Sequence, residues 1–260
     1  MKIAFFGHYF SKERGSLPTT EAIANLLNND LIHSVQLYSK LKNKWLRAVS
    51  HLIGALVGNY DQAFVDVYSG NSFLLATRIA QVLKLRGRPV TGVLRGGALL
   101  EMFEQQPHKK DRLKIFDRII TPSNQISSKL SHENISVTVI PNPVDLDKFS
   151  HHPRNMGLSD SVVTLLWVRA FTEIYRPELA IDCLKALLDS GQDARLTMVG
   201  PDLGLEAKIR IYATQNGVMD NVEFEGPVHH DLLPQYYEKN DFFLNTTKYE
   251  SFGNAVAEAA

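Results

Sequence analysis

The sequence predicts an α/β fold that is built on parallel β-sheets and divided into two units. Short apolar runs, typical of buried parallel strands, alternate with helical stretches along all 260 residues. A proline-containing stretch at 141–149 should be extended and stiff, because proline fixes its own backbone angle and restricts the residue before it. We therefore place an N-terminal unit at 1–143 and a C-terminal unit at 144–260.

The apolar runs define the expected strands. In the first unit they lie at 2–6, 34–38, 63–68, 89–94, 118–121 and 137–141, and in the second at 162–168, 195–199, 222–224 and 241–244. Helical stretches between them are expected at 19–27, 72–85, 124–130, 177–188, 205–215 and 231–237, with others ending near residue 57 and beginning at Asn254. Such regular alternation is typical of parallel sheets covered by helices.

Composition narrows the class of protein. The 28 basic and 28 acidic residues give a formal net charge of zero, so no global charge points to nucleic acid. Cys183 is the single cysteine, which permits no internal disulfide and fits a reducing compartment. The apolar part of residues 1–7 is too short for a signal peptide, and no run reaches the roughly 20 apolar residues of a membrane span. We expect a cytoplasmic protein.

The last stretch of the chain is the most informative. The strand at 241–244 is followed by a loop that places Glu250 at the carboxyl end of a strand, where ligands of parallel sheets bind. The helix that begins at Asn254 should carry Glu258 on the same face as its first residue. Backbone N–H groups at this helix start form an anion site, contributed by Ser251, Phe252, Gly253 and Asn254. Two carboxylates around an anion site suit a nucleotide-sugar, which has a charged centre and hydroxyls at both ends.

Glu250 and Glu258 stand in an E-x7-E pattern within the context Y-E-S-F-G-N. An isolated E-x7-E also fits surface glutamates on an amphipathic helix, and the strand–loop–helix context favours a site. With that context the sequence resembles retaining glycosyltransferase family 4. The resemblance implies the GT-B fold, in which two Rossmann-like domains with parallel sheets face each other across a cleft. Because the family continues beyond the motif helix, we interpret the second domain as incomplete and the chain as C-terminally truncated.

The resemblance also implies roles for residues of the second unit. Arg169 matches the family's diphosphate-binding Arg, and Arg176 stands near the position of its Lys. Glu258 is implied to hold the ribose hydroxyls of the donor, and Glu250 the hydroxyls of the transferred sugar. Further donor contacts are implied at Gly200, Val228, Ser251, Phe252, Gly253 and Asn254. No D-x-D motif stands in these loops, so we expect a reaction without a metal ion or cofactor.

The first unit is implied to form the acceptor side. Its loop at 7–18 carries Gly15, for which a role near the donor phosphates and a place in a solvated loop are equally good interpretations. Arg95 and Gly96 follow the strand at 89–94, where many family members have a His that reaches the donor sugar. Arg95 is therefore expected either to contact an anionic acceptor or donor phosphate, or to be a surface residue beside a flexible turn.

A stretch at 40–57 allows two interpretations. Lys40, Lys42, Lys44 and Arg47 lead into a helix whose apolar residues follow helical spacing. Basic residues beside an apolar stripe can mark a helix on a membrane surface. A helix that packs its stripe on the sheet needs the same pattern, and we favour this second interpretation, with weak peripheral membrane contact as the alternative.

These features together predict a retaining glycosyltransferase that moves a sugar from a nucleotide-diphosphate sugar to a glycan, lipid-linked or small-molecule acceptor. The implied setting is cell-envelope polysaccharide synthesis, in the cytoplasm or at the inner face of the membrane. The alternative is a catalytically inactive nucleotide-sugar-binding or scaffold protein of the same fold. A third interpretation keeps the donor site with epimerase or phosphorylase chemistry, although no cofactor lysine site is recognisable for a phosphorylase.

Overall fold

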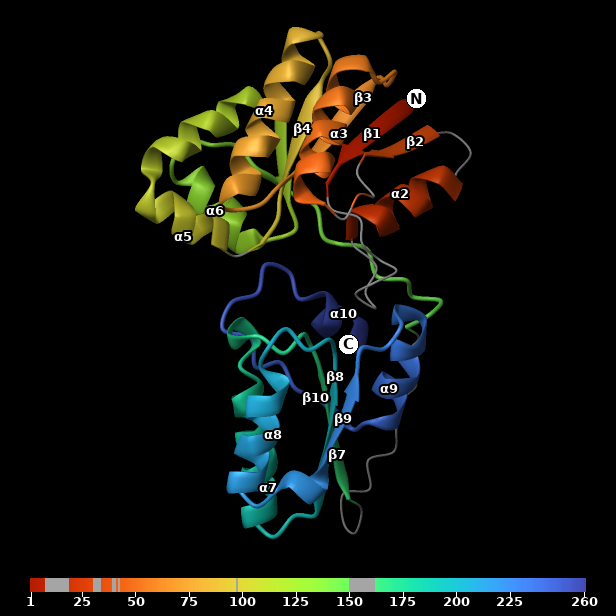
Figure 1. The fold of residues 1–260 in the computed structure, drawn as a ribbon, viewed down its shortest axis with the longest axis vertical. Helices are drawn as coiled ribbons and strands as arrows, with labels where there is room; N and C mark the ends of the chain where they lie inside the picture. Colours follow the sequence, from red (N-terminus) through yellow and green to blue (C-terminus); the bar gives the residue numbers. More distant parts are fainter. Residues whose placement is uncertain (8–18, 30–33, 39–40, 42, 97, 150–161) are drawn as a thin grey trace. The chain divides into compact units, whose positions relative to one another are not determined.

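The computed structural model describes residues 1–7, 19–29, 34–38, 41, 43–96, 98–149 and 162–260 (Figure 1). The chain forms two compact units. One contains the described residues up to Pro143, and the other contains Val144–Tyr249 and Gly253–Ala260 wherever these are described. Each unit has a parallel β-sheet with helices packed against it, which confirms the predicted α/β class. Gly15, Lys40 and Lys42 lie outside the described residues.

The sheet of the first unit has the order β2-β1-β3-β4-β5-β6, and all neighbouring strands are parallel. The change of direction between β1 and β3 is that of a doubly wound sheet, whose ligands bind at the carboxyl ends of the strands. Every residue of β4 is buried, as expected for a central parallel strand. The strands are β1 Lys2–Phe6, β2 Ser34–Tyr38, β3 Gln62–Val67, β4 Val90–Leu94, β5 Arg118–Thr121 and β6 Thr138–Val139.

The described helices of this unit include two that the sequence analysis did not predict, α5 and the 3₁₀ helix η1. The buried side chains of α5 are Leu99, Leu100, Met102 and Phe103, which is a helical pattern. The charged run that follows it resembles a loop in sequence, but it folds as η1 with Leu113 buried. The helices are α2 Thr19–Asn29, α3 Lys44–Val57, α4 Asn71–Leu85, α5 Ala98–Gln105, η1 Pro107–Ile115 and α6 Asn124–Ser131.

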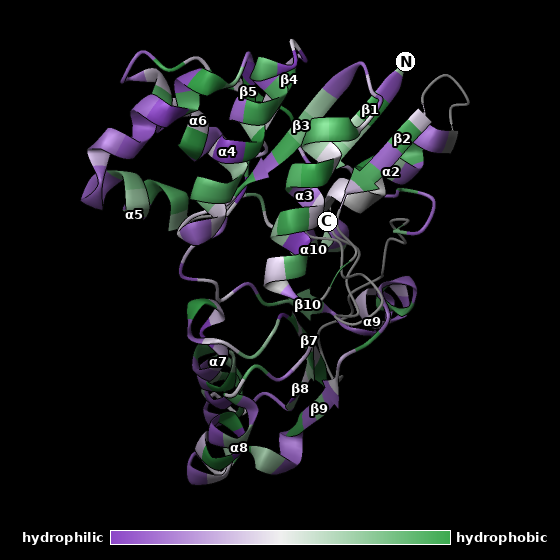
Figure 2. Cartoon of the chain, turned by 45° about the horizontal axis from the view of Figure 1, so that its top comes forward, coloured by the Kyte–Doolittle hydropathy of each residue, from purple (hydrophilic) through white to green (hydrophobic). Residues whose placement is uncertain are grey.

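The interpretation of α3 as a helix that buries its apolar stripe is wrong. Figure 2 shows an apolar helix, and the large apolar side chains on its outer side are exposed, from Trp45 at 73% to Val57 at 73%. The helix instead packs through small residues, because Gly54 lies against the ring of Tyr38 and Ala55 is completely buried. A large residue does not fit at Gly54, where an added Cβ would lie 2.3 Å from a ring carbon of Tyr38.

The second unit contains a four-stranded parallel sheet of order β10-β7-β8-β9. Its strands are β7 Val163–Val168, β8 Ala194–Val199, β9 Val222–Gly226 and β10 Phe242–Phe243. Its helices are α7 Pro177–Asp189, α8 Glu206–Gln215, α9 Leu233–Lys239 and α10 Asn254–Ala259, with 3₁₀ turns at Glu173–Tyr175, Met219–Asn221 and His230–Leu232. Pro177 begins α7 at a position where its missing N–H costs no hydrogen bond.

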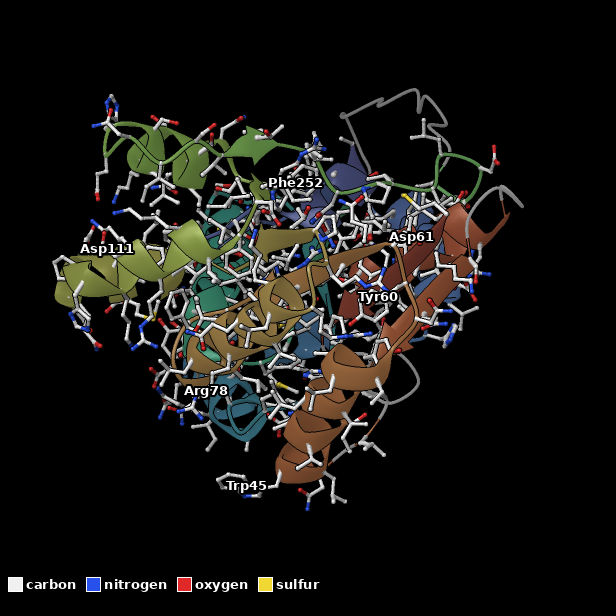
Figure 3. All side chains as sticks on the ribbon, turned by 90° about the horizontal axis from the view of Figure 1, so that it is seen from above. Trp45, Tyr60, Asp61, Arg78, Asp111 and Phe252 are labelled. Carbon is white, nitrogen blue, oxygen red and sulfur yellow. The ribbon has the colours of Figure 1, made fainter. Side chains whose placement is uncertain are left out.

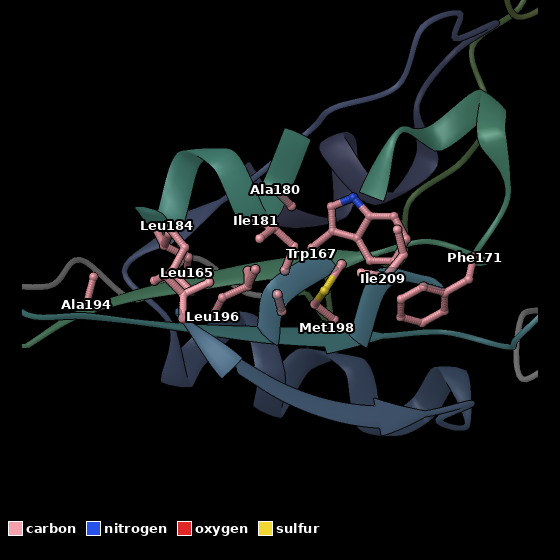
Figure 4. Close-up of a cluster of buried hydrophobic side chains, with 12 residues drawn as sticks. Leu165, Trp167, Phe171, Ala180, Ile181, Leu184, Ala194, Leu196, Met198 and Ile209 are labelled. Carbon is pink, nitrogen blue, oxygen red and sulfur yellow. The ribbon is translucent and has the colours of Figure 1, made fainter. Parts of the chain in front are cut away.

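The core of the second unit is centred on Trp167, which is completely buried between the sheet and the helices (Figure 4). Its ring lies 5.0 Å from that of Phe171, measured between centroids. The indole N–H donates a hydrogen bond of 2.9 Å to the hydroxyl of Thr246, in the loop after β10. The core is thus joined directly to the loop that precedes the E-x7-E motif.

Candidate functional site

The candidate site of the second unit lies at the carboxyl ends of its parallel strands. Arg169 follows β7, Gly200 follows β8, and the segment Asn245–Thr247, which we call the anchor segment, follows β10 after Leu244. Because β10, β7 and β8 are neighbours in the sheet, these three loops leave it at the same edge. This is the edge at which parallel α/β sheets bind ligands.

Arg169 is half-buried and makes contacts with the anchor segment. Its guanidinium lies 3.4 Å from Asn245 Oδ1 and 3.4 Å from Thr247 Oγ1, and it also donates to the carbonyl of Val168 at 3.2 Å. The guanidinium carbon lies 5.5 Å from the centroid of the Tyr175 ring. These contacts orient the guanidinium toward the anchor segment.

Arg176 reaches the same segment from the other end of the β7–α7 loop. Its Nε donates to the carbonyl of Thr246 at 2.8 Å, although the side chain as a whole is exposed. Its backbone is left-handed, with φ of +43°, which is uncommon for a residue other than glycine. The structure therefore brings both predicted diphosphate ligands, Arg169 and Arg176, onto the anchor segment.

Sequence reasoning did not identify Thr246 as the residue that holds this loop. Its side chain is buried, and its hydroxyl accepts from Trp167 and donates to the carbonyl of Tyr175 at 2.6 Å. Thr246 lies next to the polar Asn245 and Thr247, and nothing in the spacing of these residues distinguishes it. Its role follows from the position of Trp167, which only the packed sheet provides.

Gly200 is placed by backbone packing. Its φ is +150°, and an added Cβ would lie 1.8 Å from the carbonyl oxygen of Arg169. The loops after β7 and β8 therefore approach more closely than any other residue type at this position allows. Val228, in the turn after β9, is partly buried against the cluster of Leu166, Val199 and Leu233.

Glu258 is held by two residues that the sequence analysis did not connect with it. Its Oε1 lies 2.9 Å from His230 Nε2, and its Oε2 accepts from the hydroxyl of Tyr237 at 3.3 Å. Burial, and then the charge of Glu258, raise the pKa of Tyr237 far above its usual range. The positive charge of Arg169 acts on the same pKa in the opposite direction.

The remaining motif residues lie just before α10 and at its first position. Glu250, Ser251 and Phe252 are half-buried and fall outside the compact second unit, which resumes at Gly253. Gly253 has φ of +84° and precedes α10, and its carbonyl accepts from the N–H groups of Val256 and Ala257. Asn254, the first residue of α10, is exposed. Within the second unit, Arg169 and Arg176 therefore meet on the anchor segment, and Glu258 is held by His230 and Tyr237.

In the first unit, the interpretation of Arg95 as a surface residue is wrong. Arg95 is buried, and its Nε lies 2.7 Å from Oδ1 of Asp66, which also accepts from the hydroxyl of Thr20. The pair forms because Arg95 follows β4 and Asp66 lies on the adjacent β3. Gly96, with φ of +85°, forms the turn after it.

The other chemical groups that the sequence analysis considered lie away from these residues. Cys183 in α7 is half-buried, and burial together with Asp182 raises the pKa of its thiol, which disfavours the nucleophilic thiolate. Within the described part of the chain, no three His, Cys, Asp or Glu side chains gather in a way that could hold a metal ion. No helix among the described residues is long and apolar enough to cross a membrane.

Residues 162–260 match the family model described as glycosyl transferases group 1. A D-inositol 3-phosphate glycosyltransferase of Geodermatophilus obscurus is 30% identical over 134 residues. That match covers 46% of this chain and 30% of the relative, so the matched region spans less than a third of the relative's length.

Solved structures are similar over nearly the whole chain. The lipopolysaccharide outer core galactosyltransferase WaaB, in its apo form, has a TM-score of 0.68 at 17% identity, with 100% of this chain and 78% of that one covered. A structure described as trehalose-6-phosphate from Escherichia coli bound with UDP-2-fluoro glucose has a TM-score of 0.65 at 11% identity, with 100% of this chain and 81% of that one covered. The chain therefore has the GT-B fold, and residues 162–260 of its second unit have the sequence pattern of the group 1 glycosyl transferases.

Proposed function

We propose that this protein is a retaining glycosyltransferase of family 4 that uses a nucleotide-diphosphate sugar as its donor. The observation that carries the proposal is the attachment of Arg169 and Arg176 to the anchor segment, at the carboxyl edge of the sheet. This edge lies within the residues that match the group 1 model. The bound UDP-sugar analogue of a structure with the same fold supports a donor of this class.

The proposed mechanism is electrostatic. Arg169 and Arg176 stabilise the diphosphate as it leaves, and fixed positive charges of this kind act most strongly on charge that develops in the transition state. Glu258, oriented by His230 and Tyr237, accepts hydrogen bonds from the ribose hydroxyls. Glu250 contacts the transferred sugar. Because the arginines supply the positive charge, the reaction should need no metal ion and no cofactor, and EDTA should leave the rate unchanged.

The remaining assignments concern the acceptor and the setting. We propose that the first unit contributes the acceptor side and that the acceptor is a glycan, a lipid-linked or a small molecule. Synthesis of cell-envelope polysaccharide in the cytoplasm, or at the inner face of the membrane, fits these acceptors. One of the similar structures is named as a lipopolysaccharide outer core galactosyltransferase, and its name supports an acceptor that contains glycan and lipid.

The decisive experiment measures donor binding and product stereochemistry. Calorimetry with a panel of nucleoside-diphosphate sugars should identify a donor, and Arg169→Ala and Arg176→Ala should each weaken its binding by about 1.5–3 kcal/mol. The matched control is Arg195→Ala, an exposed arginine at the start of β8, on the opposite edge of the same sheet. NMR of the product should show retention at the anomeric carbon.

The outcomes separate the proposed function from its alternatives. If Arg169→Ala and Arg176→Ala bind the donor as tightly as the wild type and the Arg195→Ala control do, the diphosphate site is refuted. Binding without transfer to any acceptor class would favour a nucleotide-sugar-binding protein. A donor whose sugar is epimerised without transfer would identify the third chemistry.

A further inference from the structure

The outer side of α3 is the most unusual surface among the described residues. Its large apolar side chains are between 53% and 73% exposed: Trp45, Leu46, Val49, Ile53, Leu56 and Val57. Their spacing of three, four and seven residues puts them on one face of the helix. Scattered exposed apolar residues are normal on a protein surface, but a contiguous apolar face marks a place of interaction. Figure 3 shows Trp45 at the periphery of its unit, beyond the outer end of the helix.

The fold of this unit fixes α3 with that face outward. The hydroxyl of Tyr60 donates to the carbonyls of Gly54 and Ala55, at 3.1 and 3.3 Å. The guanidinium of Arg86 donates to the carbonyls of Ala55 and Gly58, at 2.8 and 3.0 Å. These bonds hold the last turn, and the close approach of Gly54 to the Tyr38 ring leaves no room for a larger inward residue. Rotation of the helix to bury the apolar face would break all of these contacts.

A shallow groove runs along the same face. It has a volume of about 370 Å³ and is lined mainly by apolar side chains, among them Tyr38, Leu41, Leu46, Val49, Ile53 and Val57. Five of these six lining residues are aliphatic, and the hydroxyl of the sixth is already bonded to Gln36 at 3.0 Å. Ser50 and Gly54 complete the lining. The groove therefore suits a mainly apolar occupant, such as hydrocarbon.

The charge of the sequence around this face indicates what the occupant is. Residues 31–60 contain Lys40, Lys42, Lys44 and Arg47 and not one Asp or Glu, although basic and acidic residues balance over the whole chain. Arg47 lies on α3 beside the apolar face, and its NH1 donates to the carbonyl of Leu41 at 3.1 Å. An anionic surface with an apolar interior complements both the charge and the apolar face.

We propose that α3 is a membrane-docking helix that lies in the surface of a bilayer containing anionic lipids. Its apolar face enters the boundary between headgroups and acyl chains, with the indole of Trp45 at the headgroup level where tryptophan is favoured. The net positive charge of the sequence at 31–60 attracts this region to anionic headgroups. This inference goes beyond the proposed transfer reaction and does not depend on it, because it uses only residues of the first unit.

The test uses vesicles and the full chain. The protein should pellet with vesicles of phosphatidylcholine plus phosphatidylglycerol. It should stay in the supernatant when salt is added or when the vesicles contain phosphatidylcholine alone. The chain has only two tryptophans, and Trp167 is completely buried, so a blue shift of the emission on binding should report entry of Trp45 into the lipid. The triple variant Val49→Ser, Ile53→Ser, Leu56→Ser should weaken vesicle binding at least about tenfold.

Matched controls separate this face from a general effect. Leu85→Ser removes an apolar side chain of the same unit that is 89% exposed on α4, and it should leave binding unchanged. Lys44→Gln with Arg47→Gln should weaken binding to anionic vesicles, whereas Lys114→Gln with Arg112→Gln, at exposed positions of η1, should not. Circular dichroism should show all variants folded, because Leu85 and the three substituted apolar residues of α3 are exposed.

Three results would overturn the proposal. The first is wild-type protein that sediments with neither kind of vesicle. The second is a triple variant that binds as well as the wild type and shows the same blue shift. The third is a wild-type dimer, seen by sedimentation velocity and dissociated by the triple variant, without vesicle binding; the face would then be an interface between copies.

Discussion

Thr246→Val is expected to destabilise the second unit through the loss of a single hydroxyl. Valine has nearly the shape of threonine, so the substitution leaves the buried indole N–H of Trp167 without its 2.9 Å acceptor. A buried donor without a partner costs about 1–3 kcal/mol, and the lost 2.6 Å bond to the carbonyl of Tyr175 adds about 0.5–1.5 kcal/mol. We expect a loss of about 2–4 kcal/mol in the free energy of unfolding, a large share of the stability of a typical domain.

Urea unfolding followed by tryptophan emission measures this effect in the second unit. A Trp45→Phe background leaves Trp167 as the only tryptophan, and its burial makes the emission sensitive to opening of the core. Thr246→Ser keeps the hydroxyl and removes one methyl group, so it should cost about 1 kcal/mol. Thr214→Val is the matched control, because its hydroxyl bonds the carbonyl of Arg210 on the exposed side of α8. If Thr246→Val is no less stable than Thr246→Ser, the hydroxyl does not hold the loop and the reasoning fails.

Three further predictions concern the two units separately. Glu258→Gln should raise the KM for the donor about tenfold with little change in kcat, because ribose contacts are the same in the ground and transition states. Glu250→Gln should instead lower kcat. The reverse pattern in steady-state kinetics would contradict these roles. Arg95→Met should lower the free energy of unfolding by about 3–5 kcal/mol, because it leaves the carboxylate of Asp66 buried without the Arg95 guanidinium. In urea unfolding, the double variant with Asp66→Asn should recover part of this loss. If the effects of the two substitutions simply add, the two residues are not coupled. Gly200→Ala should cost about 3 kcal/mol, since its Cβ would collide with the Arg169 carbonyl, and a melting temperature equal to the wild type would disprove the close approach.

Local sequence patterns were sufficient for most of the strands and for the sheet class. The strands β1, β2 and β5 have the predicted bounds, because each is a short apolar run between turn-forming or polar residues. The unpredicted α5 and η1 show the limit of this reasoning, since a charged run such as 108–114 folds as a 3₁₀ helix only through its contacts with α4 and α5.

The motif residues could be predicted in position but not in their partners. Arg169 and Arg176 stand at a strand's carboxyl end, which the pattern of strand, loop and helix is enough to indicate. Their attachment to the anchor segment depends on β10 lying beside β7, and strand order is a property of the whole sheet. The pairing of Glu258 with His230 likewise joins residues that are 28 positions apart, and no helical or strand period relates them.

Local patterns in the sequence are therefore enough to predict the alternation of strands and helices, the sheet edge that carries the candidate site, and the amphipathic character of α3. Three features follow only from packing: which face of α3 is turned inward, the pairing of Arg95 with Asp66, and the anchoring of the site loop by Thr246. All three have one cause. Periodicity in a sequence reports which residues share a face, whereas the fit of Gly54 against Tyr38, of a guanidinium against a carboxylate, or of an indole against a hydroxyl depends on atoms that are distant along the chain and meet only after folding.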